Sequence, residues 1–213
     1  MDYLEKIASY IFEGNHLDIG SLIDTALNDE IPVKEIVEKG MVAGIEHLGK
    51  KWDEGTIYLP EVFRSVRAAK TGFEALKPAI AKSDMVAKGK VVVGTIEGDM
   101  HDIGKNLVKL VLEADGFHVI DLGVDVTPAK FQQAVAEEKA DIVAISALLT
   151  TTVIGIPQVI EALKESGLRS GVKVIVGGAP LNEKFARELG ADAYGKDCFQ
   201  AIDIANDLVK GNI

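Results

Sequence analysis

The sequence contains one cysteine, Cys198, and only four histidines among its 213 residues. A single cysteine cannot form an internal disulfide, and the chain has no Cys-x-x-Cys motif for zinc or an iron–sulfur cluster. Basic residues are also scarce, because 23 lysines and arginines stand against 33 aspartates and glutamates, for a formal net charge of −10 at pH 7. This balance argues against a dedicated nucleic-acid-binding protein and against an anionic membrane surface as a partner.

The sequence also lacks a secretory signal and a convincing membrane segment. Its first ten residues, MDYLEKIASY, do not show the basic and then apolar order of a signal peptide, so we expect a cytoplasmic protein. One uncharged stretch, residues 142–160, is long enough to suggest a membrane helix. It contains three consecutive threonines together with serine, glycine and proline, which a helix facing lipid would not favour. A buried strand, a polar loop and a helix start fit this stretch better.

Residues 1–88 show helical periodicity and almost nothing else. Apolar residues at steps of three and four predict four amphipathic helices, and their short connections predict an antiparallel bundle. The predicted helices cover residues 4–11, a segment after an N-cap at Asp18, residues 32–52 with Pro32 in the first turn, and a segment from about Pro60. The polar stretch KSDMVAKGK, residues 82–90, is the predicted linker to the rest of the chain.

From Lys90 on, short runs of Val and Ile alternate with helical segments, which is typical of a parallel sheet with helical crossovers. The predicted strands are Val91–Ile96, His118–Leu122, Ile142–Ser146, Val172–Val176 and a short strand near Asp192–Tyr194. The predicted helices are Ile103–Asp115, Pro128–Lys139, Val153–Ser166, Asn182–Leu189 and Phe199–Lys210. We therefore expect an α/β domain over residues 89–213, Rossmann-like with the flavodoxin-like strand order 2-1-3-4-5. In that order, ligands bind outside the carboxyl ends of strands one and three.

The loops after these two strands carry the polar residues that would converge there. They read GDMHDIGKN at residues 98–106 and SALLTTT at residues 146–152. The first loop is one residue too long for a phosphate loop, and Asn106 stands where that motif needs Ser or Thr. A receiver domain would end strand three in an aspartate, whereas this strand ends in Ser146. Binding of FMN is compatible with the fold, although a hydroxyl-rich first loop would serve it better.

His101 is the most informative residue of the first loop. On spacing alone, a surface histidine bonded to Asp99 or Asp102 is the safer interpretation. The alternative is a metal ligand, and because the other three histidines lie in helical or strand contexts, no cluster of protein ligands is expected. A lone protein ligand suffices when the cofactor supplies the remaining ones, as a macrocycle does. Asp99 could then accept the imidazole's other N–H, and a hydroxyl from the third-strand loop could donate to Asp99.

At these positions the sequence resembles a known family. Asp99-x-His101-x-x-Gly104, Ser146-x-Leu148 and Gly177-Gly178 are similar to the DxHxxG, SxL and GG signature of cobalamin-binding domains. The stretch GKKWDEGTIYLP, residues 49–60, is similar to the helical cap of methionine synthase and of corrinoid proteins in one-carbon methyl transfer. The resemblance implies a stand-alone corrinoid protein of the methylamine, methanol, methoxyaromatic or betaine methyltransferase systems. Residues 1–88 would then be the methyl-cap domain and residues 89–213 the cobalamin-binding domain.

The resemblance also implies roles for individual residues. His101 would be the lower axial ligand of cobalt in place of the cofactor's own benzimidazole base, with Asp99 and Thr152 as a relay behind it. Trp52 and Leu59 would cover the upper face, although Trp52 alone fits a core position equally well. The remaining implied cofactor contacts, to the corrin or its nucleotide tail, are Gly98, Met100, Asp102, Ile103, Gly104, Ser146, Leu148, Thr150, Gly177, Gly178, Tyr194 and Cys198. Taken alone, Gly177-Gly178 could be an ordinary strand-to-helix turn and Cys198 a packing residue.

The function implied by the resemblance is that of a methyl carrier rather than a complete enzyme. Cobalamin, alternating between methylcobalamin and cob(I)alamin, would shuttle a methyl group from a substrate-specific methyltransferase to a second one that acts on tetrahydrofolate or a thiol. A reductive activator is a further expected partner. Because the cap would block both methyltransferases, the linker at residues 82–90 is the expected hinge.

Two other classes share parts of this pattern. Cobalamin-dependent sensors add a DNA-binding module and carry a Glu-His pair in the cap, where this chain has Glu61-Val62-Phe63 and no basic helix-turn-helix region. The small subunit of carbon-skeleton mutases shares the Asp99 to Gly104 motif but normally lacks a four-helix cap. The methyl donor cannot be read from the sequence, because the partner enzyme binds it.

Overall fold

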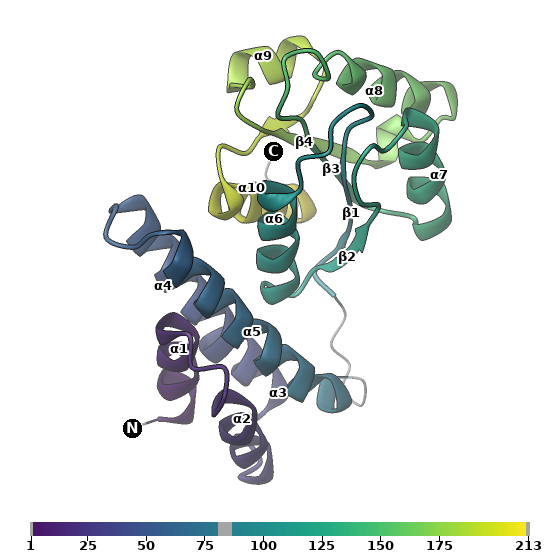
Figure 1. Ribbon diagram of the computed structural model, residues 1–213. Coiled ribbons are helices and arrows are strands. Elements are labelled where there is room, and N and C mark those ends of the chain that lie inside the picture. Colours follow the sequence, from purple (N-terminus) through teal and green to yellow (C-terminus); the bar gives the residue numbers. More distant parts are fainter. Residues whose placement is uncertain (1, 81–86, 212–213) are drawn as a thin grey trace. The chain divides into compact units, whose positions relative to one another are not determined.

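The computed structural model describes residues 2–80 and 87–211 (Figure 1). The chain divides into two compact units, one made largely of residues 1–86 and one made largely of residues 87–213. Most of the predicted linker, residues 82–86, lies outside the described residues. Within residues 2–80 and 87–211, no helix combines the length and the apolar character that crossing a membrane requires.

The first unit is helical, as predicted. Its elements are α1 (Tyr3–Glu13), α2 (Ile19–Asn28), α3 (Val33–Glu35), the π-helix η1 (Ile36–Val42), α4 (Ala43–Asp53) and α5 (Leu59–Ile80). Isoleucines and leucines at helical spacing form its core, and those without any exposed surface include Ile7, Ile11, Ile19, Ile23, Ile36, Leu48 and Leu76. Amphipathic helices of this kind gain most of their stability from burying such a face.

Two details of this unit differ from the prediction. The third predicted helix runs without a break from α3 to α4, but residues 36–42 are π-helical. Gly40 of η1 and Gly44 of α4 face α1. A Cβ atom on Gly44 would lie 2.8 Å from Cβ of Ile11, so the glycine allows the two helices to approach closely. Asp18 is the N-cap residue of α2, as predicted. Its side chain, however, makes no capping hydrogen bond and instead accepts one from Asn15.

The second unit is built on a five-stranded parallel sheet with the order β2-β1-β3-β4-β5, as predicted. The strands are β1 (Lys90–Thr95), β2 (His118–Asp121), β3 (Ile142–Ser146), β4 (Lys173–Gly177) and β5 (Ala193–Tyr194). The helices are α6 (Ile103–Ala114), α7 (Pro128–Glu138), α8 (Gly155–Glu165), the 3₁₀-helix η2 (Arg169–Gly171), α9 (Glu183–Glu188) and α10 (Cys198–Lys210). Figure 1 shows α7 and α8 on one face of the sheet and α6 and α10 on the other.

The differences in this unit are at element ends. Ile96 lies outside β1 and forms an isolated parallel bridge with Val126. The helix predicted from Val153 begins at Gly155, because residues 150–154 form turns. Asp192 is not in β5, and its carboxylate accepts a hydrogen bond from the Val174 N–H at 2.6 Å. These shifts do not alter the strand order.

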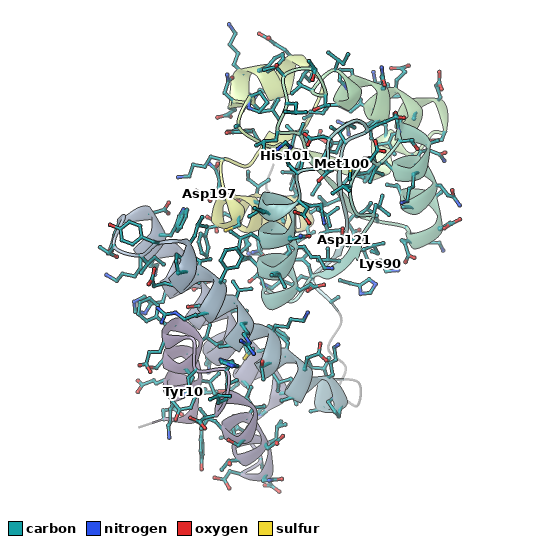
Figure 2. All side chains as sticks on the ribbon, in the orientation of Figure 1. Tyr10, Lys90, Met100, His101, Asp121 and Asp197 are labelled. Carbon is teal, nitrogen blue, oxygen red and sulfur yellow. The ribbon has the colours of Figure 1, made fainter. Side chains whose placement is uncertain are left out.

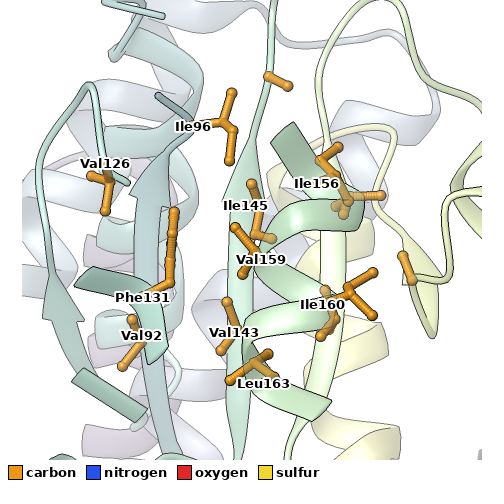
Figure 3. Packing of buried hydrophobic residues seen from close by; sticks show 14 of the residues in the cluster. Val92, Ile96, Val126, Phe131, Val143, Ile145, Ile156, Val159, Ile160 and Leu163 are labelled. Carbon is orange, nitrogen blue, oxygen red and sulfur yellow. The ribbon is translucent and has the colours of Figure 1, made fainter. Parts of the chain in front are cut away.

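A buried apolar layer fixes the sheet against α7 and α8. Figure 3 shows Val143 and Ile145 of β3 packed beside Val159 and Leu163 of α8. Phe131 of α7 is fully buried, and a Cβ atom on Gly94 would lie 2.8 Å from its ring. Because Thr95 pairs with Ser146 in the register, β1 and β3 end side by side and their loops leave the same edge of a rigid sheet.

Candidate functional site

The site is centred on Asp99, a fully buried carboxylate in the loop after β1. Its Oδ1 accepts a hydrogen bond from the His101 N–H at 3.0 Å and lies 2.7 Å from Nδ1 of the His101 ring. Its Oδ2 accepts hydrogen bonds from the loop after β3, from the N–H groups of Leu148 at 2.6 Å and Leu149 at 3.3 Å. The two loops were predicted to converge, and the carboxylate of Asp99 connects them by hydrogen bonds.

These contacts decide the charge of Asp99. Burial by itself raises the pKa of a carboxyl group, because the charged form loses its hydration. The hydrogen bonds from His101, Leu148 and Leu149 outweigh this effect and lower the pKa from 3.8 to about 2. Asp99 is therefore ionised at neutral pH although it has no contact with solvent.

His101 shows one ring edge to Asp99 and the other to solvent. An ionised carboxylate can only accept, so Nδ1 must carry a proton and donate it to Asp99. The neutral ring then has its free electron pair on Nε2. The side chain is 53% exposed, and in the described part of the chain Nε2 has no hydrogen-bond partner. The ring and Met100 lie in the loop that leads into α6 (Figure 2). This is the arrangement of a histidine prepared to bind a metal through Nε2.

Thr152 is the predicted third member of the relay, and it has two acceptors. Its Oγ1 lies 3.3 Å from Oδ2 of Asp99 and 3.0 Å from the carbonyl oxygen of Leu149. A hydroxyl has one proton, so it donates to only one of these oxygens at a time. Thr152 therefore supports Asp99 less firmly than the two backbone N–H groups do.

The His101 loop is also held from the side of β2, which the sequence analysis missed. The N–H of Gly98 donates to Oδ1 of Asp125 at 2.7 Å, and the N–H of Asp125 donates to the carbonyl oxygen of Asp99 at 3.1 Å. Gly98 has a φ of 80°, which favours glycine at this turn. The sequence did contain a hint of this contact. Asp125 lies in the loop between β2 and α7, two residues after Gly123, and polar residues in such loops often hold neighbouring loops.

A buried ion pair anchors α6 to the end of β2. Nζ of Lys105, whose side chain is 2% exposed, lies 2.8 Å from Oδ1 of Asp121, and Nζ of Lys109 lies 3.1 Å from Oδ2. Burial raises the pKa of Asp121, but hydrogen bonds from Lys105, the Gly123 N–H and Lys109 lower it to about 2. Lys105 also donates to Asn106, which in turn donates to Asp102 beside His101.

Apolar side chains around His101 are unusually exposed. Met100 and Ile103 expose 69% and 70% of their surface, and Leu148 and Leu149 expose 40% and 39%. A Cβ atom on Gly104, at the start of α6, would meet nothing within 4 Å, so the fold itself does not require glycine there. An exposed apolar surface with open space beside a free imidazole nitrogen fits a large cofactor with apolar edges.

The paired glycines after β4 have a reason within the fold. Gly178 has a φ of 132°, and a Cβ atom there would lie 1.9 Å from the carbonyl oxygen of Ala147. A Cβ atom on Gly177 would lie 3.1 Å from the carbonyl oxygen of Gly195. The backbone of this turn therefore packs directly on the loop after β3, whatever ligand passes nearby.

The other predicted contacts are distributed around this edge. Ser146 ends β3 and is half-buried, Thr150 is exposed in the following turn, and Tyr194 is half-buried in β5. Cys198 begins α10 and is buried, and burial raises the pKa of its thiol to about 12. This thiol is protonated and packed in the interior.

Trp52 and Leu59 lie on either side of the turn between α4 and α5. Trp52 is half-buried in the last turn of α4, and Leu59 is the first residue of α5 and 44% exposed. Tyr58 and Phe63, which the sequence analysis did not single out, are exposed in the same region. This end of the helical unit therefore offers aromatic and apolar side chains to solvent.

His101 can supply one ligand to a metal, so a metal bound there must have its other ligands from a cofactor. Across residues 2–80 and 87–211, no group of three His, Cys, Asp or Glu side chains could hold a bare metal ion. A single imidazole with a fixed tautomer can complete the coordination of a macrocycle.

Comparison with known proteins identifies the family. Residues 89–203 match the family model of the B12 binding domain, and residues 3–77 match a second B12 binding domain model. The chain is 41% identical over 212 residues to a corrinoid protein of Desulfitobacterium hafniense, with 98% of each chain covered. This chain belongs to the corrinoid proteins. Its cofactor is cobalamin.

Two further proteins are similar to this corrinoid protein, one in sequence and one in structure. It is 43% identical over 178 residues to trimethylamine corrinoid protein 2 of Methanosarcina acetivorans, covering 83% of this chain and 82% of that one. It also resembles a chain in the solved methanol:cobalamin methyltransferase complex of Methanosarcina barkeri, with a TM-score of 0.86 and 32% identity. That match covers 98% of this chain and 80% of the other. The predicted fold class and the predicted family are confirmed.

Proposed function

We propose that this corrinoid protein carries a methyl group between two methyltransferases and binds cobalt through Nε2 of His101. The observation that supports this most strongly is the Asp99–His101 pair, in which a buried carboxylate 2.7 Å from Nδ1 leaves Nε2 free on a half-exposed ring. When bound, cobalamin supplies a cobalt ion that can take up and give back a methyl group.

Asp99 orients the ring and sets its basicity. Hydrogen bonds from Leu148 and Leu149 fix the carboxylate before the cofactor arrives, so binding the metal costs little reorganisation. The negative charge would make Nε2 a stronger donor to a metal. Because the pKa of Asp99 is about 2, the carboxylate stays ionised at neutral pH and keeps accepting the hydrogen bond from Nδ1.

The exposed apolar residues would contact the edge of the corrin. Met100, Ile103, Leu148 and Leu149 lose their contact with water when a large ring covers them, at about 25 cal/mol per Å² of buried apolar surface. Gly104 leaves room for the ring to approach α6. Ser146, Thr150, Gly177 and Gly178 would lie along the nucleotide tail, and the loop from Tyr194 to Cys198 would close the far end of its channel. Gly98 and Asp102 are further proposed contacts of the cofactor.

The helical unit, residues 1–88, is proposed to be the methyl cap. Trp52 and Leu59 would cover the upper face of the cofactor and exclude water from it, with Tyr58 and Phe63 adding apolar surface. In this proposal the cap would move aside to give a partner enzyme access to the cofactor.

The relatives suggest the kind of partner. One is a trimethylamine corrinoid protein, and the solved complex is a methanol:cobalamin methyltransferase. We propose a first partner that acts on a small methylated compound of this kind. A second methyltransferase that uses tetrahydrofolate or a thiol, and a reductive activator, complete the proposed cycle.

The decisive variant is His101→Ala, with His118→Ala as its matched control. His118 is an exposed histidine of β2 in the same unit, so its loss removes an imidazole without touching the Asp99 carboxylate. After mixing with hydroxocobalamin and gel filtration, the wild type and His118→Ala should retain the cofactor with the same visible spectrum. His101→Ala should retain less cofactor with a changed spectrum. Equal retention and an identical spectrum in all three proteins would refute the assignment.

A further inference from the structure

Asp125 adopts a left-handed backbone conformation, which is uncommon outside glycine, although aspartate and asparagine take it more readily than other residues. Its φ is 53°, and within the described residues only Glu30 and Lys139 are other non-glycine residues with positive φ. Lys139 is the C-cap of α7 and Glu30 follows the cap of α2, where left-handed residues commonly end helices. Asp125 instead lies inside the loop between β2 and α7. Such strain persists only where the surroundings hold the residue in place.

The surroundings that hold Asp125 belong to the His101 loop. Its carboxylate accepts the Gly98 N–H at 2.7 Å, and its own N–H donates to the carbonyl oxygen of Asp99 at 3.1 Å. These two bonds connect one residue to two consecutive residues of the loop. The two residues with positive φ, Asp125 and Gly98, are therefore joined directly by a hydrogen bond.

The segment around Asp125 is itself fixed to β1. The N–H of Thr95 donates to the carbonyl oxygen of Gly123 at 3.0 Å, and the N–H of Val126 donates to that of Thr95 at 2.9 Å. Val126 is fully buried in the core. Asp125 thus connects the His101 loop to the rigid sheet, on the side opposite the loop after β3.

We propose that Asp125 is a positioning residue for His101, acting through the backbone of Gly98 and Asp99. The loop after β3 holds the carboxylate of Asp99, whereas Asp125 holds the main chain that carries it. The hydroxyl of Thr95, which donates to the carbonyl oxygen of His101 at 2.9 Å, holds the same main chain from β1. Asp125 adds the restraint at Gly98 and Asp99, the two residues before Met100 and His101. This inference rests on the proposed role of His101 as the cobalt ligand.

Three variants separate the side-chain contact from the backbone strain. Asp125→Asn keeps an oxygen acceptor and tolerates positive φ, so it should behave like the wild type. Asp125→Gly relieves the strain but removes the acceptor. Lys139→Gly is the control, because it relieves a positive φ of 52° at the end of α7 without touching the His101 loop.

Two readouts apply to the full-length protein. The first is amide hydrogen exchange without cofactor, in which the Gly98 N–H should exchange on the order of tenfold faster in Asp125→Gly than in the wild type. The second uses protein whose histidines carry ¹⁵N, loaded with hydroxocobalamin reduced to Co(II). The ¹⁵N splitting of its EPR spectrum reports the fraction with a histidine on cobalt, because the cofactor's own base carries ¹⁴N. That fraction should fall in Asp125→Gly, and the cofactor should bind on the order of tenfold more weakly. Asp125→Asn and Lys139→Gly should match the wild type.

The possible outcomes separate the role of Asp125 from the proposed role of His101 as the cobalt ligand. If Asp125→Gly exchanges faster at Gly98 but keeps the wild-type EPR spectrum and affinity, Asp125 is only a structural contact and the inference is wrong. An equal loss of the EPR nitrogen splitting in Lys139→Gly would also refute the inference. The loss in Asp125→Gly could then come from replacing any residue of positive φ by glycine. If the wild type and His101→Ala give identical EPR spectra, the proposed ligand itself fails, whatever Asp125 does.

Discussion

Two carboxylates of the α/β unit, the fully buried Asp99 and the more exposed Asp121, have the same low pKa of about 2 for different reasons. Asp121 is held by the side-chain nitrogens of Lys105 and Lys109. Asp99 is held mainly by neutral backbone N–H groups and by one imidazole. The first arrangement fixes a helix to a strand. The second leaves an unpaired nitrogen at the surface, so only the second can do chemistry.

The largest expected effect is on stability, from Asp121→Ala. This change leaves the ammonium of Lys105 buried with Asn106 as its remaining partner, which should lower the free energy of unfolding by about 3–5 kcal/mol. Lys109→Ala removes a more exposed partner and should cost less than about 1 kcal/mol. Urea unfolding of the protein without cofactor measures both. Similar losses in the two variants would contradict the view that the Lys105 pair is the anchor.

Asp99→Asn should show the reverse pattern, with a large effect on the cofactor and a smaller one on stability. The amide cannot accept from all the donors around Asp99 and no longer supplies a negative charge to the ring. Cobalamin affinity should fall on the order of 10–100-fold, the range typical of residues that support a metal ligand. Equilibrium binding of hydroxocobalamin tests this, and an unchanged affinity would remove Asp99 from the site.

Acid should destabilise the protein through both carboxylates. Because the pKa of Asp121 is lower in the folded chain, its contribution is complete above about pH 5 and is lost as the pH falls through 3.8 towards about 2. Asp121→Asn should therefore flatten the dependence of the unfolding free energy on pH in this range. A slope equal to that of the wild type would show that Asp121 is not responsible.

The smallest expected effect is at Thr152, whose hydroxyl is shared between two acceptors. Thr152→Ser keeps the proton donor and should bind cobalamin as the wild type does. Thr152→Val removes it and should weaken binding about threefold, since one neutral hydrogen bond contributes about 1 kcal/mol or less. A loss as large as that of Asp99→Asn would mean that the hydroxyl is a principal support of the carboxylate.

The sequence was sufficient to predict the sheet and the centre of the site. Val and Ile runs of the right length predicted all five strands, and parallel strands bring the ends of β1 and β3 together whatever the details of the loops. Asp99 and His101 could be singled out because they lie in one of the two loops that this topology joins, whereas Thr152 was implied by the family resemblance. The structure adds the distances and the donors from Leu148 and Leu149.

What could not be predicted depends on contacts between distant segments. The π-helix η1 contains Gly40, which packs on Ile7 of α1, and helical periodicity alone predicts neither the π-helix nor that contact. Asp125 acts through backbone atoms of a loop 27 residues away, with a φ that the sequence does not specify. Gly178 resembled a ligand-binding glycine, but its conformation is already required by the carbonyl oxygen of Ala147.

The most direct test of the central claim is the EPR spectrum of Co(II) cobalamin bound to protein whose histidines carry ¹⁵N. If His101 is the lower ligand, the nitrogen splitting should change from the ¹⁴N pattern seen with unlabelled protein to the ¹⁵N pattern, and His101→Ala should abolish it. A ¹⁴N pattern that persists in the labelled protein would mean that the cofactor keeps its own base on cobalt, and the account would be wrong.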